Sequence, residues 1–318
     1  MKRLMIIDAL NAYFRAYIVD PSLSINGDPI GGYKGFVKIL QKLCREIRPD
    51  EIVIAWDGAG GSQKRKAVNK NYKEGRKPIR LNRSIRNMTE DEEMKNKVWQ
   101  QYRLMEMLNY TPVIQLVSDG IEADDVISFV SQHPKYKGWQ KVIISSDKDF
   151  YQLCDDETVL YRPIQKIFMN KPRIIEQFGI HPTNFALARA IVGDKSDNLD
   201  GVRGVGLATV AKKMPFFKGE NSVTIDEVID FCENDNSGLK TLSSIRNSRD
   251  LISENYKIMQ LYSPAISIQT KSKLKYSLEN FEPVFNQTEI IKRMREDGFG
   301  EWNTSDLFAT FKRIVSKA

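Results

Sequence analysis

Residues 141–149 read Lys-Val-Ile-Ile-Ser-Ser-Asp-Lys-Asp, an apolar run that ends in Asp147 and Asp149. A short apolar run bounded by polar residues is typical of a buried strand. Similar runs lie at residues 4–7, 52–56, 111–117 and 158–161. Helical patterns separate them at residues 33–47, 91–108 and 122–132. This alternation predicts an α/β fold with a mostly parallel central sheet flanked by helices.

The second half of the chain has a different pattern. From about Phe178 onward the strand-like runs fade, and helical patterns occupy residues 183–192, 208–213, 225–233 and 249–261. We therefore expect an α/β domain over residues 1–180 and a smaller helical domain over residues 181–318. The longest apolar runs fall well short of the roughly 18 residues of a membrane span, so we expect no contact with a membrane. The three cysteines form no C-x-x-C pair, which is typical of reduced thiols in a cytoplasmic protein.

Positive charge is concentrated in one segment. The chain has 48 Lys and Arg against 41 Asp and Glu, a formal net charge of +7. Residues 62–86 alone contain ten basic residues and one acid, Glu74, so the rest of the chain is slightly acidic. This distribution is expected of a protein that binds a polyanion. The segment is too long for an ordinary connection, and we expect it to form a basic arch at about residues 58–93.

Acidic residues follow the expected strands. Three of these strands lead into aspartates, namely Asp8, Asp57 and the pair Asp147 and Asp149. Further acids lie at the start of a helical pattern and near the domain junction: Glu122, Asp124, Asp125, Asp194 and Asp197. In an open parallel sheet, ligands bind beyond the carboxyl ends of the strands. We therefore expect these side chains to meet at that edge of the sheet.

Each acid by itself has an ordinary structural explanation, because Asp is a common N-cap or turn residue and acids at a helix start suit the helix dipole. Gathered at one edge, the carboxylates would raise one another's pKa values unless cations neutralised them. Oxygen ligands without Cys or His favour Mg²⁺ or Mn²⁺, and the chain contains only two histidines. Two such ions ~3.5–4 Å apart can activate a water molecule and stabilise the leaving oxygen of a phosphodiester.

In order and spacing, these acidic motifs resemble those of the 5′-nuclease superfamily. That superfamily includes flap endonucleases, the 5′-nuclease domains of bacterial DNA polymerases, phage 5′-exonucleases and replicative ribonuclease H proteins. The matching segments are Asp8 and residues 53–57, 122–125, 145–149 and 193–198. The resemblance covers about residues 1–214.

The resemblance implies two Mg²⁺ ions, which Mn²⁺ can replace. The residues implied around the first ion are Asp8, Asp57, Asp124 and Asp147. Those implied around the second are Asp149, Asp194 and Asp197. Glu122 and Asp125 would bridge the ions or orient water molecules.

Residues 72–76, Tyr-Lys-Glu-Gly-Arg, resemble the Tyr-Lys-x-x-Arg element of the helical arch in this family. The resemblance implies that Lys73 and Arg76 act on the scissile phosphate and that Tyr72 stacks on a terminal base. If the segment is helical, Lys73 and Arg76 share one face of the helix.

Residues 201–209, Gly-Val-Arg-Gly-Val-Gly-Leu-Ala-Thr, resemble the helix-three-turn-helix that holds duplex DNA and often a K⁺ ion. The backbone N–H groups of such a turn can hold a phosphate. The nucleic-acid-binding residues implied here are Gly204, Gly206, Thr209 and Lys212. The chain departs from the family pattern where it has Asp200, Arg203 and Ala208 in place of two common prolines and a frequent lysine. We therefore expect its affinity for duplex DNA to differ from that of proteins with the usual family pattern.

The resulting hypothesis is a metal-dependent 5′-3′ exonuclease or flap endonuclease of DNA replication or repair, with RNase H-type primer removal as one form. Its expected substrates are DNA and RNA–DNA hybrids with 5′ ends or flaps. Its expected protein partners are replication proteins such as a single-strand-binding protein or a sliding clamp. We expect a monomer in the cytoplasm, or in the host cytoplasm if the chain is phage-encoded. Two alternatives stay open. A PIN-class ribonuclease also uses strand-end acids but lacks the arch and the glycine-rich turn, and a non-catalytic module that binds branched DNA would not retain every acid.

Overall fold

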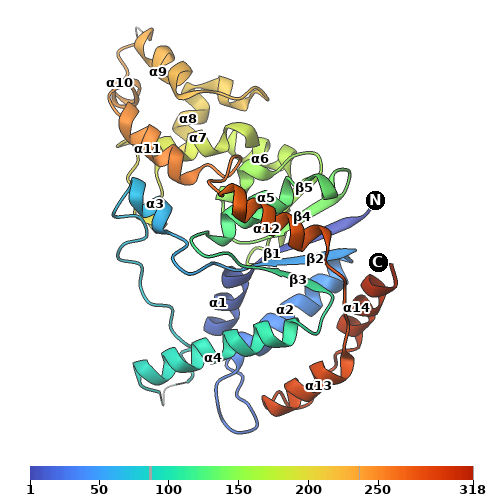
Figure 1. The fold of residues 1–318 in the computed structure, drawn as a ribbon. Coiled ribbons are helices and arrows are strands. Elements are labelled where there is room, and N and C mark those ends of the chain that lie inside the picture. Colours follow the sequence, from blue (N-terminus) through green and yellow to red (C-terminus); the bar gives the residue numbers. More distant parts are fainter. Residues whose placement is uncertain (86–87, 236, 318) are drawn as a thin grey trace.

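The computed structural model describes residues 1–85, 88–235 and 237–317 of the chain. Within these residues six strands form one sheet in the order β3-β2-β1-β4-β5-β6 (Figure 1). The strands are β1 (Arg3–Asp8), β2 (Glu51–Ala55), β3 (Val113–Leu116), β4 (Gln140–Ile144), β5 (Thr158–Arg162) and β6 (Ile167–Met169). Strands β1 to β5 are parallel to their neighbours, whereas β6 is antiparallel to β5. The predicted, mostly parallel sheet is confirmed, although the short strand β6 was not anticipated.

Alternate residues of the central strands face opposite sides of the sheet. In β1, Leu4 and Ile6 pack into one hydrophobic core, whereas Met5 and Ile7 pack into the other. This alternation follows from the two-residue period of a strand. Both faces are covered by helices, which explains why the strand sequences are continuous apolar runs.

Each core contains its own set of helices. The core around Met5 and Ile7 includes α1 (Ala9–Val19), α2 (Gly31–Ile47), α4 (Glu90–Leu108), α13 (Gln287–Glu296) and α14 (Ser305–Lys317). The core around Leu4 and Ile6 includes α5 (Ala123–Ser131), α6 (Lys171–Phe178), α7 (Pro182–Val192), α8 (Leu207–Lys213), α9 (Ile225–Glu233), α10 (Lys240–Arg246), α11 (Arg249–Met259) and α12 (Ile268–Glu279). The predicted flanking helices and the helical C-terminal region are therefore present.

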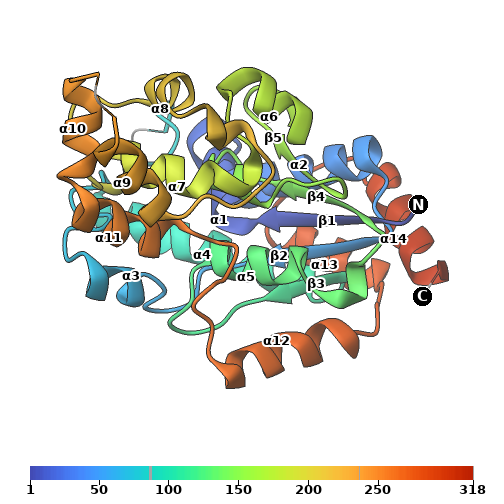
Figure 2. The same cartoon turned by 90° about the horizontal axis from the view of Figure 1, so that it is seen from above.

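The last helices of the chain return to its first third. Phe308 and Phe311 of α14 are buried in the same core as Phe36 and Leu40 of α2. Figure 2 shows α14 near the start of β1, while α12 lies beside the edge strand β3. The boundary predicted at residue 180 stays a prediction, since both cores draw side chains from the two halves of the chain.

The basic segment is mostly irregular. It forms α3 (Gln63–Val68), then turns over residues 70–75, and then a stretch without helix or strand over residues 76–85 (Figure 1). Helix α4 begins after Thr89, whose side chain forms a capping box with Glu92. Arg86, counted in this segment, lies outside the described residues. In the described part of the chain, no helix is both long and apolar enough to cross a membrane.

Candidate active site at the acidic edge of the sheet

Strands β1 and β4 place three aspartates at the same edge of the sheet. Asp8 is the last residue of β1 and the N-cap of α1, where its carboxylate accepts a hydrogen bond from the backbone N–H of Asn11 at 3.2 Å. Ser145, the residue after β4, donates its hydroxyl to the same carboxylate at 2.9 Å. Asp147 accepts a hydrogen bond from the backbone N–H of Asp149 at 2.8 Å. Because β1 and β4 are parallel neighbours, their carboxyl ends bring these acids together.

Asp57 ties the acids of α5 to this edge. It follows β2, and its carboxylate accepts a hydrogen bond from the backbone N–H of Ala123 at 2.8 Å. This bond holds the first turn of α5, which carries Asp124 and Asp125. The negative charges of Asp147 and Asp8 both act on Asp124, so the three carboxylates form one electrostatic group.

Burial and mutual repulsion raise the pKa of five of these carboxyls, among them Asp125, which burial raises despite the nearby charge of Arg65. Burial raises the pKa of Asp8 to about 7, and the charges of Asp57 and Asp147 add to the rise. Burial, followed by the charge of Asp147, also raises the pKa of Asp149 to about 7. The pKa values of Asp124 and Asp147 are raised mainly by burial as well. A cation among these groups would favour their charged forms.

A buried arginine neutralises the acids at the start of α5. Arg65 of α3 is 9% exposed and donates two hydrogen bonds to the carboxylate of Asp125, at 3.0 and 3.1 Å, and another to Glu122. It also donates to the carbonyl of Ile258 at 3.0 Å, which joins α3 to the end of α11. Burial would raise the pKa of Glu122, but the positive charges of Arg65 and Lys73 outweigh it and hold that pKa below its usual value.

Residues 72–76 rest against the acids. The hydroxyl of Tyr72 donates to Glu122 at 3.1 Å, Lys73 donates its Nζ to the same carboxylate at 2.6 Å, and Arg76 forms an ion pair with Asp197. Two expectations need correction. The segment forms turns, with Lys73 at a φ of 58°, so Lys73 and Arg76 do not share a helical face. The ring of Tyr72 is 2% exposed, which leaves it no free face for the predicted stacking on a base.

Arg189 is a second basic residue that sequence reasoning did not find. It lies in the last turn of α7 and is largely buried; its Nε donates to Asp149 at 3.0 Å, and its guanidinium also forms an ion pair with Asp194. The sequence does contain a signal. Arg189 is the one charged residue in the apolar run 185–192, and a charge in such a helix is rarely buried without an acidic partner. Arg65 carried no such signal, because it lies among other basic residues.

The glycine-rich turn connects α7 to α8. Gly201 packs so closely against Val192 that a Cβ would lie 1.8 Å from the carbonyl oxygen of that residue. In contrast, no described atom lies within 4 Å of a Cβ placed on Gly204, which has a φ of +77°, or on Gly206. The backbone of these two glycines is therefore open to a ligand. Thr209 and Lys212 follow on α8, and Lys212 is exposed.

The predicted metal ligands share one chemistry, since all are carboxylates, and hard oxygen donors suit Mg²⁺ or Mn²⁺. The raised pKa values of Asp8 and Asp149 fit the same kind of ion. Within the described ranges, however, no three Asp, Glu, His or Cys side chains stand close enough to enclose an ion as they are placed. Five of the predicted ligands (Glu122, Asp125, Asp149, Asp194 and Asp197) instead form ion pairs with Arg65, Lys73, Arg76 or Arg189.

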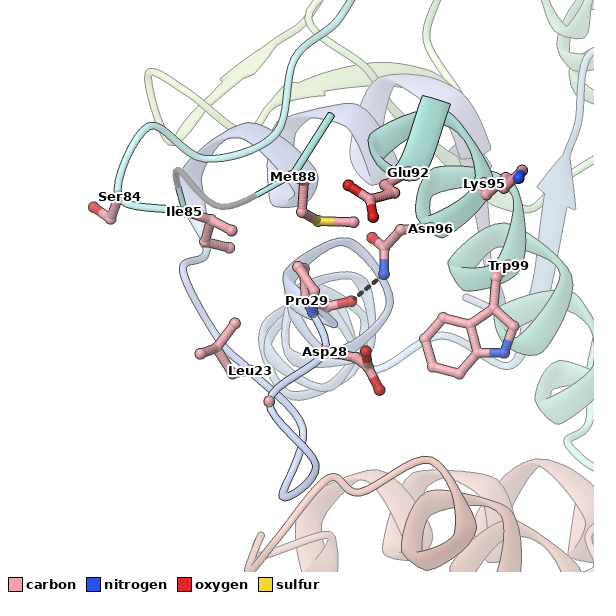
Figure 3. A pocket seen from close by; sticks show the side chains of 11 residues that line it. Leu23, Asp28, Pro29, Ser84, Ile85, Met88, Glu92, Lys95, Asn96 and Trp99 are labelled. Carbon is pink, nitrogen blue, oxygen red and sulfur yellow. Dashed lines mark hydrogen bonds between the residues drawn. The ribbon is translucent and has the colours of Figure 1, made fainter. Parts of the chain in front are cut away.

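A cavity of about 920 Å³ lies between the loop that follows α1 and the start of α4 (Figure 3). Asn96 of α4 donates a hydrogen bond to the carbonyl of Pro29 at 2.9 Å, and Trp99 forms part of the wall. The charged residues of its lining are Asp28, Glu92 and Lys95, so it presents no cluster of positive charge for a phosphate. At 1.5 Å per residue, α1 separates Asp8 from this loop by roughly 16 Å. The cavity is therefore distinct from the acidic edge.

Comparison with known proteins places the chain among nucleases. Residues 3–179 match the family described as the 5'-3' exonuclease, N-terminal resolvase-like domain. The chain is 30% identical over 214 residues to a 5'-3' exonuclease of Aquifex aeolicus, which covers 66% of this chain and 68% of that protein. It is 26% identical over 309 residues to DNA polymerase I of Bacillus subtilis, which covers 94% of this chain but 31% of the polymerase. The chain belongs to the 5'-3' exonuclease family.

The fold agrees with this membership. The flap endonuclease D15 of bacteriophage T5, solved in complex with DNA and metal ions, matches with a TM-score of 0.65 at 18% identity, over 93% of this chain and 98% of that chain. At this level of identity the likeness concerns the fold. As a member of its family, the chain is a 5′-3′ exonuclease and thus a phosphodiester hydrolase.

Proposed function

We propose that the chain is a structure-specific 5′-nuclease that cuts DNA and RNA–DNA hybrids near free 5′ ends or at flaps. One observation carries this proposal: acids from the ends of β1, β2 and β4 meet the acids of α5 and the basic side chains at the base of the arch. A PIN-class ribonuclease would account for the acids but not for the basic segment. A non-catalytic module would account for the basic segment but not for so many buried acids, whose raised pKa values disfavour the folded state.

The acidic edge is proposed to hold two Mg²⁺ ions, for which Mn²⁺ can substitute. Asp8, Asp57, Asp124 and Asp147 would hold the first ion, and Asp149, Asp194 and Asp197 the second. Glu122 and Asp125 would bridge them or orient water molecules. When bound, such ions lower the pKa of an attacking water and stabilise the leaving oxygen. Support comes from the burial of Asp8 and Asp149 at one edge, because acids whose charged forms are disfavoured have most to gain from a cation.

Lys73 and Arg76 are proposed to act on the scissile phosphate. The Arg76 side chain is 50% exposed and that of Lys73 is 21% exposed, so both can be reached by a nucleic-acid strand. Their present partners, Glu122 and Asp197, hold them beside the acidic edge. A phosphodiester bound at that edge offers a negative charge within reach, and positive groups aimed at it would stabilise the charge that develops during hydrolysis.

The turn between α7 and α8 is proposed to be a helix-three-turn-helix that holds the duplex. Gly204 and Gly206 would present their open backbone to a phosphate or a K⁺ ion, and Thr209 and Lys212 would contact the strand from α8. The arch lies beside this turn, because Asn198 donates its side-chain N–H to the carbonyl of Asn71 at 2.9 Å. One substrate could therefore contact the arch and the turn at the same time.

We also propose a setting for this activity. The similarity to DNA polymerase I favours a role in DNA replication or repair, with removal of RNA primers as one form. We propose a monomer in the cytoplasm, or in the host cytoplasm if phage-encoded, that works beside a single-strand-binding protein or a sliding clamp. The helical residues 181–318 are proposed to form the duplex-binding domain.

End-labelled flap, nicked and RNA–DNA hybrid substrates test the proposal directly. Each substrate is incubated with Mg²⁺, with Mn²⁺ or with chelator, and the product lengths are mapped. We expect cleavage near the 5′ end that requires the metal, with one of the three structures cut fastest. Metal-independent cleavage, or equal cleavage of unstructured single strands, would contradict a structure-specific 5′-nuclease. The Asp147→Asn variant serves as the control for contaminating nucleases.

A further inference from the structure

The guanidinium group of Arg189 stands between two acids that the proposed function assigns to the second metal ion. Its Nε donates to Oδ1 of Asp149 at 3.0 Å, and a terminal nitrogen forms an ion pair with Oδ2 of Asp194. The Arg189 side chain is 12% exposed, and those of its partners are 16% and 15% exposed. One buried cation thus bridges two nearly buried anions that come from different parts of the chain.

These ion pairs conflict with direct coordination of a metal ion. Mg²⁺ binds carboxylate oxygens at about 2.0–2.1 Å in a nearly octahedral arrangement. The oxygen atoms that accept from Arg189 face its guanidinium, and this group cannot give way by losing its proton, because arginine stays charged in proteins. An ion at Asp149 and Asp194 must therefore displace the guanidinium or bind beside its positive charge. Either event lowers the affinity for the metal.

Arg189 also has a role before any metal binds. Asp147 and Asp194 both place negative charge near Asp149, and the charge of Arg189 opposes that repulsion. Like-charged groups in a partly buried cluster need such a partner to remain close together. The same side chain therefore both preserves the arrangement of the acids and competes for them.

We propose that Arg189 is a positioning residue that acts as the resident counter-cation of the second metal site. It holds Asp149 and Asp194 in place until a divalent cation arrives, and it keeps the affinity of that site low by competing for the same oxygens. The inference rests on the proposed function, because it assumes that these two acids hold a metal ion.

Binding of Mn²⁺ to the full chain, without nucleic acid, tests this inference through the electron paramagnetic resonance signal of the free ion. Arg189→Met removes the charge and keeps much of the side-chain length. In chelator we expect this variant to melt at a lower temperature than wild type. We also expect it to bind the weaker of its two Mn²⁺ ions roughly tenfold more tightly, because one nearby charge typically changes an ionisation equilibrium by at least about tenfold. Arg103→Met is the matched control. Arg103 is 17% exposed and pairs with Glu106 and Asp297, so its loss should lower the melting temperature without changing Mn²⁺ affinity.

The outcomes separate this inference from the proposed function. If Arg189→Met binds the weaker Mn²⁺ ion no more tightly than wild type, Arg189 is not a competitor and the inference is overturned. If wild type binds no Mn²⁺ at all, the metal site itself fails, and with it the proposed function. Should Arg189→Met fail to fold, Arg189→Lys decides the question, because an ammonium group cannot bridge both acids in the same way. We expect a smaller gain in Mn²⁺ affinity for that variant, and an unchanged affinity would overturn the inference.

Discussion

At the scale of single residues, Asp147 accepts a local hydrogen bond and also carries a negative charge. The substitution Asp147→Asn can keep the hydrogen bond while removing the charge. The side-chain oxygen of Asn can still accept the N–H of Asp149, as Asp147 does at 2.8 Å. We expect Asp147→Asn to lower Mg²⁺-dependent cleavage by more than about 100-fold, since losing even a residue that only supports a metal ligand costs about 10–100-fold. Substrate affinity should change only a few-fold.

Parallel assays of cleavage and of substrate binding check this prediction. Scanning fluorimetry in chelator adds a second test. Asp147→Asn should melt at or above wild type there, because it removes one of the charges that repel each other at the acidic edge. If binding and cleavage fall together, or if the variant melts far below wild type, Asp147 is structural.

Lys73 and Arg76 are predicted to affect the chemical step more than duplex affinity. Lys73 pairs with Glu122 and Arg76 with Asp197, two acids proposed to serve the metal ions, whereas Lys212 lies on α8. We expect Lys73→Ala and Arg76→Ala each to slow single-turnover cleavage by about 10²-fold, as is found for a lost group that stabilises developing charge. The measurement uses saturating enzyme, so that binding does not limit the rate. Lys212→Ala, on α8, is the comparison: it should weaken binding while leaving the rate at saturation near wild type.

At the scale of elements, α14 is predicted to be part of the main core and not an appendage. Phe311 of α14 is 1% exposed among side chains of α2. We expect Phe311→Ala to lower the free energy of unfolding by about 3–5 kcal/mol. Val315, on the same helix, is 37% exposed, and Val315→Ala should change stability by no more than about 0.5 kcal/mol. Urea denaturation measures both. Equal, small effects would mean that α14 contributes little to the core.

At the scale of the whole molecule, the acidic edge should make the metal-free protein less stable as the pH rises. The pKa values of Asp8 and Asp149 are about 7 in the folded protein, against about 3.9 in an unfolded chain. The folded state then binds more protons than the unfolded state between these values, so stability falls with rising pH until both acids are ionised, above about pH 7. Burial lowers the pKa values of His133 and His181, so these two groups make the protein more stable as the pH rises. Their contribution is confined to pH values below about 6.5, the ordinary pKa of histidine.

Melting temperatures between about pH 6.5 and pH 8 test this prediction. In chelator the wild type should melt lower at the upper end of the range, and Asp149→Asn should show a shallower dependence. Mg²⁺ should raise the melting temperature most at the upper end, because a ligand that binds only the folded state stabilises it and binds ionised carboxylates best. A melting temperature that rises with pH in chelator would contradict the raised pKa values.

Local patterns in the sequence determined the sheet and the acidic edge. Buried strands are apolar over four or five residues whatever their partners are, and a parallel sheet brings residues that follow its strands to one edge. Asp8, Asp57 and Asp147 were therefore placed at that edge by their position after strands. The spacing of the acids also carried the family resemblance, which the match over residues 3–179 confirms.

Only the tertiary structure decided which basic side chains the acids meet. Arg65 pairs with Asp125 across 60 residues, and Arg189 pairs with Asp149 across 40. The position of Tyr72 depends on its hydrogen bond to Glu122, 50 residues further along the chain. Likewise, α14 packs in the same core as α2, which lies in the first third of the sequence. Local periodicity reports which side of an element is apolar, but a buried charge is satisfied by whichever opposite charge the fold brings within reach. The positions of the acids were predictable from the apolar residues that precede them in the chain. Their basic partners were not, because these depend on how elements distant in the sequence pack together.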